Sequence, residues 1–381
     1  MASADSSRGC HPRLSYSGLD AIARSMQPMP TGISISTHVS VAHRGILWLL
    51  FFLICMGLGY PTISRYDPRT THGLEDTTAY AAMVVGAPLQ DFQADLGHRV
   101  LVPMLARPVY WLTREHLQTW SPVFFALLTA NSVLMASAAW LLVAIAHQLT
   151  GDYAVSLLSA FLYLANFAVA NFNLSGYVDS SLNFVFIAIA WSLLAENWWT
   201  LPLWGVVGGL SKETFVPLAV VLTLAWWFST SSKGQSKVLR LAWIAGMAIV
   251  SLTVLVMVMT HQSPPYSPLS FAVSRRASSG SGHFYLDGLI HCLTAHEFVF
   301  VLGWLVPLGL PRLRQLPKAW VAGSICAGLT ALVLGAYDNA EGNTVRPIFS
   351  ACGPVFSLAA AYFLAGRSGR SKPPLPQDQL G

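Results

Sequence analysis

Carboxylates that could act as a base are concentrated in one stretch of the chain, residues 61–98, which we call the acidic loop. The sequence has 17 acidic residues in 381, and five of them fall here: Asp67, Glu75, Asp76, Asp91 and Asp95. A positioned carboxylate can take a proton from a hydroxyl group and so serve as a general base. This clustering of scarce acids indicates a candidate reaction site.

Three of these acids are the candidates for the base. The segment EDTTAYAAMVV, 75–85, predicts a short amphipathic helix with Glu75 and Asp76 in its first turn, where acids suit the positive end of the helix dipole. Asp76 is the first choice because Tyr80, four residues on, shares its helix face. Asp67 is second and Glu75 third. The structural alternative is that Glu75 and Asp76 cap the helix and Asp67 is a solvated loop acid.

Two basic residues outside the charged tails are candidates for binding a phosphate. Arg99 lies where the chain enters an apolar, proline-containing segment, and its planar fork can bind two oxygens of one phosphate. Its alternative is an ion pair with Asp95 or a lipid headgroup. Lys212 is isolated in apolar sequence, which favours a functional role such as neutralising a lipid phosphate. Its alternative is an ion pair with Glu213 or Asp179.

Asp179 and Arg346 are the remaining candidates for contacts to substrate. Each stands at the head of an apolar segment. Asp179 has the alternative role of an N-cap. Arg346 is a candidate for a second phosphate or sugar contact, and its alternative role is that of an interface anchor. The five cysteines and the histidines show no metal-site spacing, so we assign no metal ligand and no cofactor, and nothing in the sequence indicates a divalent metal.

The composition predicts the scaffold that must position these residues. Hydrophobic residues make up 54% of the chain and charged residues only 10%, against roughly 25% charged in an ordinary soluble domain. Since a membrane helix takes about 20 apolar residues, the chain is expected to be an all-α, polytopic transmembrane bundle of about ten spans. The net charge of +5 then reports orientation and does not indicate nucleic acid.

The apolar segments divide the chain into a membrane domain, 44–365, between an N-terminal tail, 1–43, predicted to be disordered, and a C-terminal tail, 366–381. The predicted spans are 44–60, 100–113, 122–148, 153–171, 181–195, 199–228, 239–260, 297–311, 319–337 and 347–365. A second long loop covers 261–296. Basic residues gather in both tails and in the linkers 229–240 and 311–318, which predicts an inner (plasma) membrane protein with both termini in the cytoplasm.

One predicted span, 199–228, has two interpretations. It is either a single tilted helix that contains Lys212 and Glu213, or two shorter spans that meet at residues 211–214 and require 153–176 to be a re-entrant hairpin. The second version places Lys212 on the same side as the acidic loop and also brings Asp179 there. We favour it, because a Lys–Glu dipeptide at mid-bilayer costs several kcal/mol unless it lines a polar cavity.

The order of these features resembles a known family. A first span is followed by an acidic loop of form D…ED..AY..M, then HRVLVPML, a lone Asp179, GGLSKETFVPL, and Arg346 before the last span. This is similar to the GT-C membrane glycosyltransferases, in particular the bacterial ArnT, mannosyltransferase and Rgt types. The resemblance implies a polyprenyl-phosphate sugar donor drawn from membrane lipid. It also implies that Asp67 or the Glu75–Asp76 pair is the base.

By the same resemblance, Arg99 and Lys212 would be phosphate contacts. One departure is that Glu75 and Asp76 lie farther from the first span than the acid pair of the family does. We therefore expect a glycosyltransferase that delivers a hexosyl or pentosyl group to a glycan, lipid or protein on the extracytoplasmic face. The alternatives are a transporter or flippase for a lipid-linked or anionic substrate, against which the lack of an internal repeat counts, and a non-catalytic membrane subunit.

Overall fold

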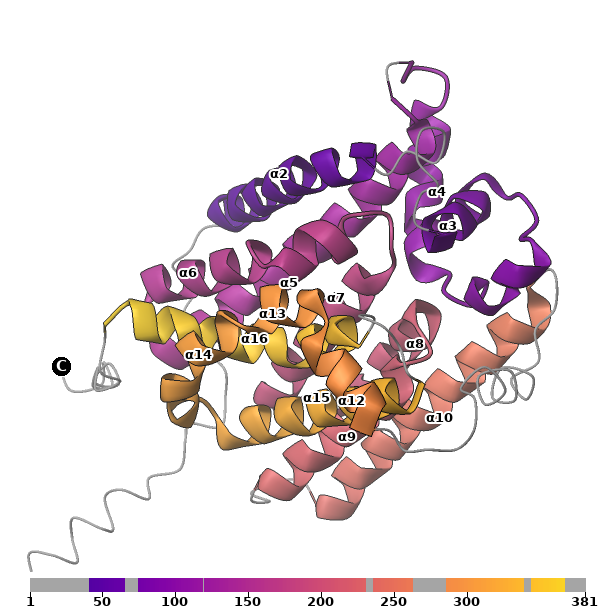
Figure 1. Ribbon diagram of the computed structural model, residues 1–381. Helices are drawn as coiled ribbons and strands as arrows, with labels where there is room; N and C mark the ends of the chain where they lie inside the picture. Colours follow the sequence, from indigo (N-terminus) through magenta and orange to yellow (C-terminus); the bar gives the residue numbers. More distant parts are fainter. Residues whose placement is uncertain are drawn as a thin grey trace, which may run out of the picture. The chain divides into compact units, whose positions relative to one another are not determined.

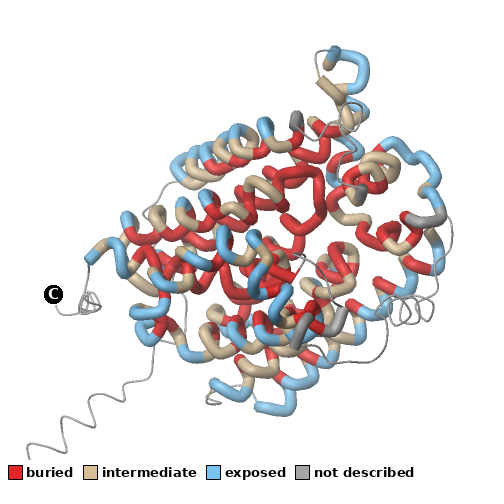
Figure 2. The backbone as a smooth tube through the Cα atoms, viewed as in Figure 1, coloured by how far each residue is buried: buried red, intermediate tan, exposed pale blue. Residues whose placement is uncertain are grey.

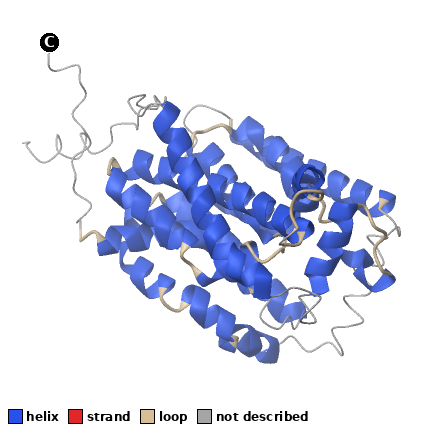
Figure 3. Ribbon diagram, turned by 90° about the horizontal axis from the view of Figure 1, so that it is seen from above, coloured by secondary structure: helices blue, strands red, loops and turns tan. Residues whose placement is uncertain are grey.

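The computed structural model describes residues 41–65, 75–118, 120–230, 236–262, 286–338 and 344–366. Within these ranges every regular element is helical, as Figure 3 shows, so the predicted all-α class is confirmed for this part of the chain. All of these residues belong to one unit, Ser40–Gly381. Asp67 lies outside the described residues, together with nearly all of both predicted tails and most of the second long loop.

Five helices are long and apolar enough to cross a membrane. Each one matches a predicted span, and each begins or ends within a few residues of the expected boundary. The five are α2 (Val41–Arg65), α5 (Pro122–Thr150), α10 (Lys237–His261), α15 (Lys318–Asp338) and α16 (Val345–Leu364). At 1.5 Å per residue, even the shortest of them approaches the ~30 Å thickness of the hydrocarbon core. The chain is thus a multi-pass helical membrane protein.

The bent segment after the second long loop makes a sixth candidate span. It consists of α12 (Leu286–Thr294), α13 (His296–Leu302), α14 (Leu305–Gly309) and the 3₁₀ turn η4 (Leu310–Gln315). Its two parts meet at 54°. The side-chain nitrogen Nδ2 of Asn166 donates to the carbonyl of Val301 over 2.9 Å, close to where α13 ends. Such side-chain bonds satisfy backbone groups that an interrupted membrane helix would leave open.

Four other predicted spans form helices that fall short of the length of a membrane span, so the count of about ten stays a prediction. The segment 100–113 forms α4 (Leu101–Thr113), and 153–171 forms α6 (Tyr153–Leu164) followed by the π turn η2 (Val169–Asn173). The segment 181–195 forms α7 (Asp179–Leu194). The fourth, 199–228, forms the 3₁₀ turn η3 (Trp198–Thr200) and two helices, α8 (Leu201–Ser211) and α9 (Phe215–Ser229).

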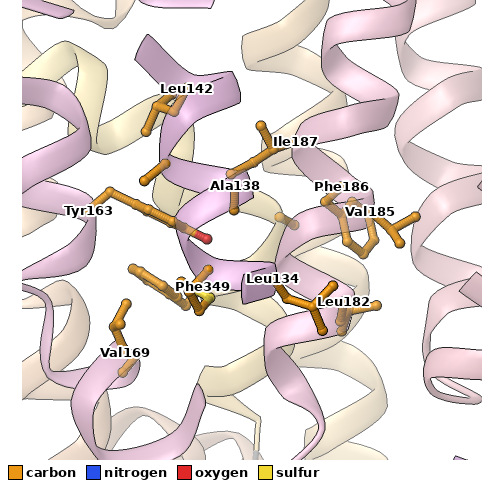
Figure 4. Close-up of a cluster of buried hydrophobic side chains, with 14 of the residues drawn as sticks. Leu134, Ala138, Leu142, Tyr163, Val169, Leu182, Val185, Phe186, Ile187 and Phe349 are labelled. Carbon is orange, nitrogen blue, oxygen red and sulfur yellow. The ribbon is translucent and has the colours of Figure 1, made fainter. Parts of the chain in front are cut away.

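The core lies around α5, α6, α7 and α16, which carry most of the fully buried residues (Figure 2). Figure 4 shows part of it, where Tyr163 stacks on Phe349 with ring centroids 5.2 Å apart. The Tyr163 hydroxyl donates to the Asn183 side chain over 2.7 Å, so its polar end is satisfied inside the apolar core. By contrast, α2 and α10 expose rows of large apolar side chains, as helices that face lipid do.

The two ends of the bundle can be told apart by contacts between neighbouring helices. At one end, which we call the loop end, lie α3 (Glu75–Val85) and the 3₁₀ turn η1 (Asp91–Leu96) of the acidic loop (Figure 1). Gln262, just after α10, donates there to the carbonyl of Ala94 over 2.6 Å. At the opposite end, Arg240 near the start of α10 contacts Glu196, which follows α7, at 2.8 Å. Hence α7 and α10 run in opposite directions.

The break between α8 and α9 lies toward the loop end. Helix α8 runs alongside α10 in the same direction, and Gly205 and Gly209 allow the two backbones to approach closely. A Cβ atom on either glycine would lie 2.7 Å from a carbonyl oxygen of α10, that of Met247 or Ser251. Such small residues four apart are common where membrane helices pack. Helix α9 then returns, so that Trp227 donates to the carbonyl of Lys237 over 3.1 Å at the opposite end. The expected break of 199–228 into two helices at 211–214 is confirmed, and the crossing of the membrane by each of them stays a prediction.

Candidate functional site

A cavity of about 260 Å³ lies at the loop end, between the acidic loop and the bundle. It is lined by residues of α3, η1, α9, α15 and α16, and by the break between α8 and α9. The charged side chains in its lining are Asp76, Asp95, Arg99, Lys212, Glu213 and Arg346. Four of the eight residues singled out from the sequence are in this group. A fifth and a sixth, Tyr80 and Asp179, contact lining residues directly.

The helix that carries Asp76 forms as predicted, over Glu75–Val85. Asp76 is partly buried and lines the cavity. Among the described residues, no hydrogen bond or ion pair is found to its carboxylate. Tyr80 is completely buried one turn later, and its hydroxyl accepts from Nη1 of Arg99 over 3.0 Å. Asp76 therefore differs from Glu213 and Asp179, which are both paired with cations, and like Asp95 it lines the cavity without an ion pair among the described residues.

Arg99 is paired with Glu213, a partner that was not expected for it, while its expected phosphate contact stays a prediction. Nε and Nη2 of Arg99 donate to the two carboxylate oxygens of Glu213 over 2.9 and 2.7 Å. The side chains are each 8% exposed. His98 Nε2 also contacts Glu213 at 2.8 Å. From the sequence, the expected partner of Arg99 was Asp95 or a lipid headgroup. Glu213 was expected only as a partner for Lys212.

Lys212 and Arg346 share one carboxylate, that of Asp179. Nζ of Lys212 lies 2.7 Å from one oxygen, and Nη1 of Arg346 lies 3.5 Å from the other. The Asp179 side chain is only 2% exposed, and those of Lys212 and Arg346 are 11% and 12% exposed. The ion pair with Asp179 that the sequence offered for Lys212 is thus present. Two cations against one anion leave this group with a surplus positive charge beside the cavity.

Arg346 is further held by two aromatic rings. Its guanidinium carbon lies 4.6 Å from the ring centroid of Phe172 and 4.2 Å from that of Tyr177, within the range of cation–π interactions. Both rings come from the irregular stretch between α6 and α7. The buried Nε of Arg346 has no hydrogen-bond partner among the described residues. The side chain is therefore fixed in place while one N–H donor stays open.

Several helix N-termini converge on the same place. Helices α9 and α16 begin directly after cavity-lining residues, Thr214 and Thr344. Helix α7 begins at Asp179, the partner of Lys212 and Arg346, and α4 begins two residues after Arg99. Each helix N-terminus carries a partial positive charge of roughly half a unit and open N–H groups. The Lys212–Arg346 pair and the helix N-termini thus both favour an anion on their side of the cavity, while Asp76 and Asp95 bring negative charge to the same lining.

The ionisation of the site follows from its burial and its charges. Burial alone would raise the pKa of Glu213, but Arg99, His98 and Lys212 together lower it well below 4.5, so the group is a carboxylate at neutral pH. Burial raises the pKa of the Tyr80 phenol, and Arg99 only partly opposes this. Tyr80 thus stays protonated and serves as a hydrogen-bonding group, while Glu213 serves as a fixed negative charge.

The remaining sequence-based candidates are placed less fully. Glu75 begins α3, and Asp67 is outside the described residues. His98, Phe172 and Tyr177 were missed. Only their proximity in the chain to Arg99 and Asp179 could have drawn attention to them. Among the described residues, no group of three or more His, Cys, Asp or Glu side chains is arranged to hold a metal ion.

The chain stands apart from the proteins with which it was compared. No family model, no curated protein sequence and no solved structure matches it. The function therefore has to be argued from the chemistry of the cavity.

Proposed function

We propose that this chain is a membrane glycosyltransferase that moves a sugar from a polyprenyl-phosphate donor to a glycan, lipid or protein acceptor at the loop end. The observation that carries the proposal is that Lys212 and Arg346 share a single carboxylate beside a cavity which Asp76 lines without a cation of its own. The Lys212–Arg346 pair suits a bound anion, and the Asp76 carboxylate suits the role of a base. The GT-C-like order of motifs in the sequence agrees with this assignment.

In the proposed reaction, the Asp76 carboxylate takes the proton of an acceptor hydroxyl group. The hydroxyl oxygen attacks the anomeric carbon of the donor sugar, and the bond from that carbon to the phosphate oxygen breaks. The departing phosphate keeps the electron pair of the broken bond. Lys212, Arg346 and the converging helix N-termini stabilise its charge in a partly enclosed site, where such stabilisation is strong. This assigns to Arg346 and Lys212 the phosphate-binding role and leaves Arg99 chiefly to Glu213 and Tyr80.

The membrane orientation is part of the proposal. The charge bias of the sequence puts the loop end on the extracytoplasmic side of an inner membrane, with both termini in the cytoplasm. The apolar lining residues Leu218, Ala331 and Leu334 belong to helices that also face outward, and Leu334 is 40% exposed. A lipid-linked donor entering from the bilayer would meet this side of the cavity.

The proposal is tested by profiling lipid-linked sugars and glycans by mass spectrometry in a strain that lacks the gene. Complementation with the native chain should restore transfer, and Asp76→Asn should lower it by roughly 10²-fold or more, the usual scale for loss of a general base. The matched control is Glu115→Gln, an exposed acid that pairs with its neighbour Arg114, which should transfer normally. Full transfer by a variant with Asp67, Glu75 and Asp76 all neutralised would sink the proposal.

A second candidate function is transport of an anionic or lipid-linked substrate. The observation that favours it is the pair of half-length helices α8 and α9, whose break lines the cavity. Transporters often bind substrate where discontinuous helices meet. Purified protein in proteoliposomes distinguishes the two functions. Flux of a polyprenyl-phosphate sugar with no covalent change to it would favour transport, whereas release of polyprenyl phosphate would favour transfer.

A further inference from the structure

We infer that Glu213 is a positioning residue, which holds the helix carrying Asp76 against the cavity by way of Arg99 and Tyr80. The inference rests on the proposed function, since it takes Asp76 as the base. It goes further because it gives the pair Arg99–Glu213 a task other than contacting the donor.

The connection is a continuous chain of hydrogen bonds from the bundle to α3. Glu213 stands in the break between α8 and α9, and both its oxygens accept from Arg99, over 2.9 and 2.7 Å. The third nitrogen of the same guanidinium, Nη1, donates to the Tyr80 hydroxyl over 3.0 Å. Tyr80 lies one turn after Asp76 in α3, so the position of one fixes the position of the other.

The chain of contacts is stiff because it is buried and because its centre is planar. The side chains of Arg99 and Glu213 are each 8% exposed, and Tyr80 is fully buried. A guanidinium presents its N–H groups in a rigid fork, so a two-point bond to Glu213 also dictates the direction of the bond to Tyr80. Lysine in place of Arg99 would keep the charge but could not hold both partners in this geometry.

Two further side-chain hydrogen bonds to α3 are found among the described residues, and both come from donors close to α3 in the chain. Gln93 donates to the Thr78 hydroxyl over 2.8 Å, and Arg107 donates to the carbonyl of Met83 over 2.8 Å. Both donors belong to residues 75–118, the same continuous segment as α3. Gln262 of the bundle reaches the carbonyl of Ala94 and therefore holds η1. Among the hydrogen bonds found, the link from Glu213 through Arg99 to Tyr80 is therefore the one that joins α3 to the α8–α9 break. Through it, Glu213 holds Asp76 in position relative to Lys212, its neighbour in the break.

Hydrogen–deuterium exchange on the full-length protein in lipid nanodiscs tests this without any need for substrate. In Arg99→Lys and Glu213→Gln, the amides of α3 should exchange about tenfold faster than in the native chain, because a charged hydrogen-bond link between α3 and the bundle is lost. The amides of α5 and α10 should be unchanged. Arg114→Lys is the matched control, since Arg114 lies in the same segment but forms an exposed pair with Glu115. It should leave α3 as it is.

Two further variants guard against misfolding and refine the chain of contacts. Glu213→Gln leaves the buried Arg99 charge unpaired, so the double variant Arg99→Met/Glu213→Gln removes both charges and should fold, since neutral replacement of both partners is usually tolerated. It should still speed the exchange of α3. Tyr80→Phe removes only the last link and should speed it less. Native-like α3 exchange in both Arg99→Lys and the double variant would overturn the positioning role.

Activity separates this inference from the proposed function. In a transfer assay, Arg99→Lys should lower kcat while the KM for the donor changes by less than about twofold, as expected when alignment and not ground-state binding is lost. A large rise in KM at normal kcat, with unchanged α3 exchange, would instead make Arg99 a donor contact and overturn the inference. If α3 exchange rises as expected but the native chain transfers no sugar, the positioning role of Glu213 stands and the role of Asp76 as base falls.

Discussion

Ion pairs occur at both ends of the bundle, yet the two ends use them differently. At the opposite end, Arg240 pairs with Glu196 at 2.8 Å and lies over the Trp198 ring at 5.1 Å. Trp198 donates to the same carboxylate over 3.2 Å. One cation there contacts one anion and one aromatic ring, an arrangement that suits a structural contact between the end of α7 and the start of α10.

At the loop end, there are more charged side chains than are needed to hold two helices together. Three cations and two deeply buried carboxylates surround a cavity, and further acids, Asp76 and Asp95, face it. Burying charge is costly, and a closed pair with apolar neighbours would serve stability equally well. On the proposed function, the loop end retains its extra charges for an occupant of the cavity, whereas the opposite end retains its pair for structure. The predictions below test this difference.

The largest effect is expected from Asp179→Asn, which removes the anion shared by Lys212 and Arg346. Two cations, each about one-tenth exposed, would be left without a full charge opposite them. Stranding a buried charge usually costs about 3–5 kcal/mol. Thermal unfolding followed by light scattering or intrinsic fluorescence should show a marked drop in Tm. An unchanged Tm would mean that water already screens this group.

The second effect concerns acid. Because the pKa of Glu213 is lowered in the folded chain, its carboxylate contributes stability that is complete above its ordinary value of 4.5. That contribution is lost progressively as the pH falls from 4.5 toward the lower folded-state value. The Tm of the native chain should therefore drop across this range. Glu213→Gln, which has no proton to gain, should start from a lower Tm and decline less steeply, and parallel curves would contradict the assignment.

The third prediction concerns Lys212→Met, which should reduce stability only slightly but weaken binding of the donor strongly. Lys212→Met leaves Asp179 with Arg346, so the buried carboxylate keeps one cation, and we expect a loss of only about 1–2 kcal/mol. The surplus positive charge beside the cavity disappears, however. Binding of a polyprenyl-phosphate sugar, measured by native mass spectrometry or by thermal shift, should weaken by roughly tenfold or more. Normal binding would place the phosphate elsewhere.

The smallest effect is expected from Glu196→Gln at the opposite end. The Arg240 side chain is 3% exposed, but that of Glu196 is 54% exposed, so water reaches the carboxylate side of the pair. Pairs open to solvent typically contribute about 1 kcal/mol or less. Glutamine can still accept from Arg240 and Trp198. The Tm should change little, and sugar transfer should be unaffected. A loss of transfer in this variant would break the division of labour between the two ends.

The sequence by itself determined the local elements of this protein. The apolar runs placed α2, α5, α10, α15 and α16 within a few residues, because a membrane helix satisfies its own backbone and needs only sufficient apolar length. The pattern of 75–85 likewise placed α3 and put Asp76 on the face of Tyr80. The isolated position of Lys212 and the glycines before it indicated the break in 199–228.

Only the tertiary structure decided which charges meet. Arg99 and Glu213 are 114 residues apart, and Lys212 and Asp179 are 33 apart. From the sequence, Lys212 could pair with Glu213 next to it or with Asp179, and Arg99 with Asp95. In the folded chain, Arg99 pairs with Glu213 instead. The backbone at Lys212 is extended, so the side chains of Lys212 and Glu213 point in different directions. Lys212 thus reaches α7 and Glu213 reaches the acidic loop. Such pairings depend on how helices pack, which local sequence does not encode.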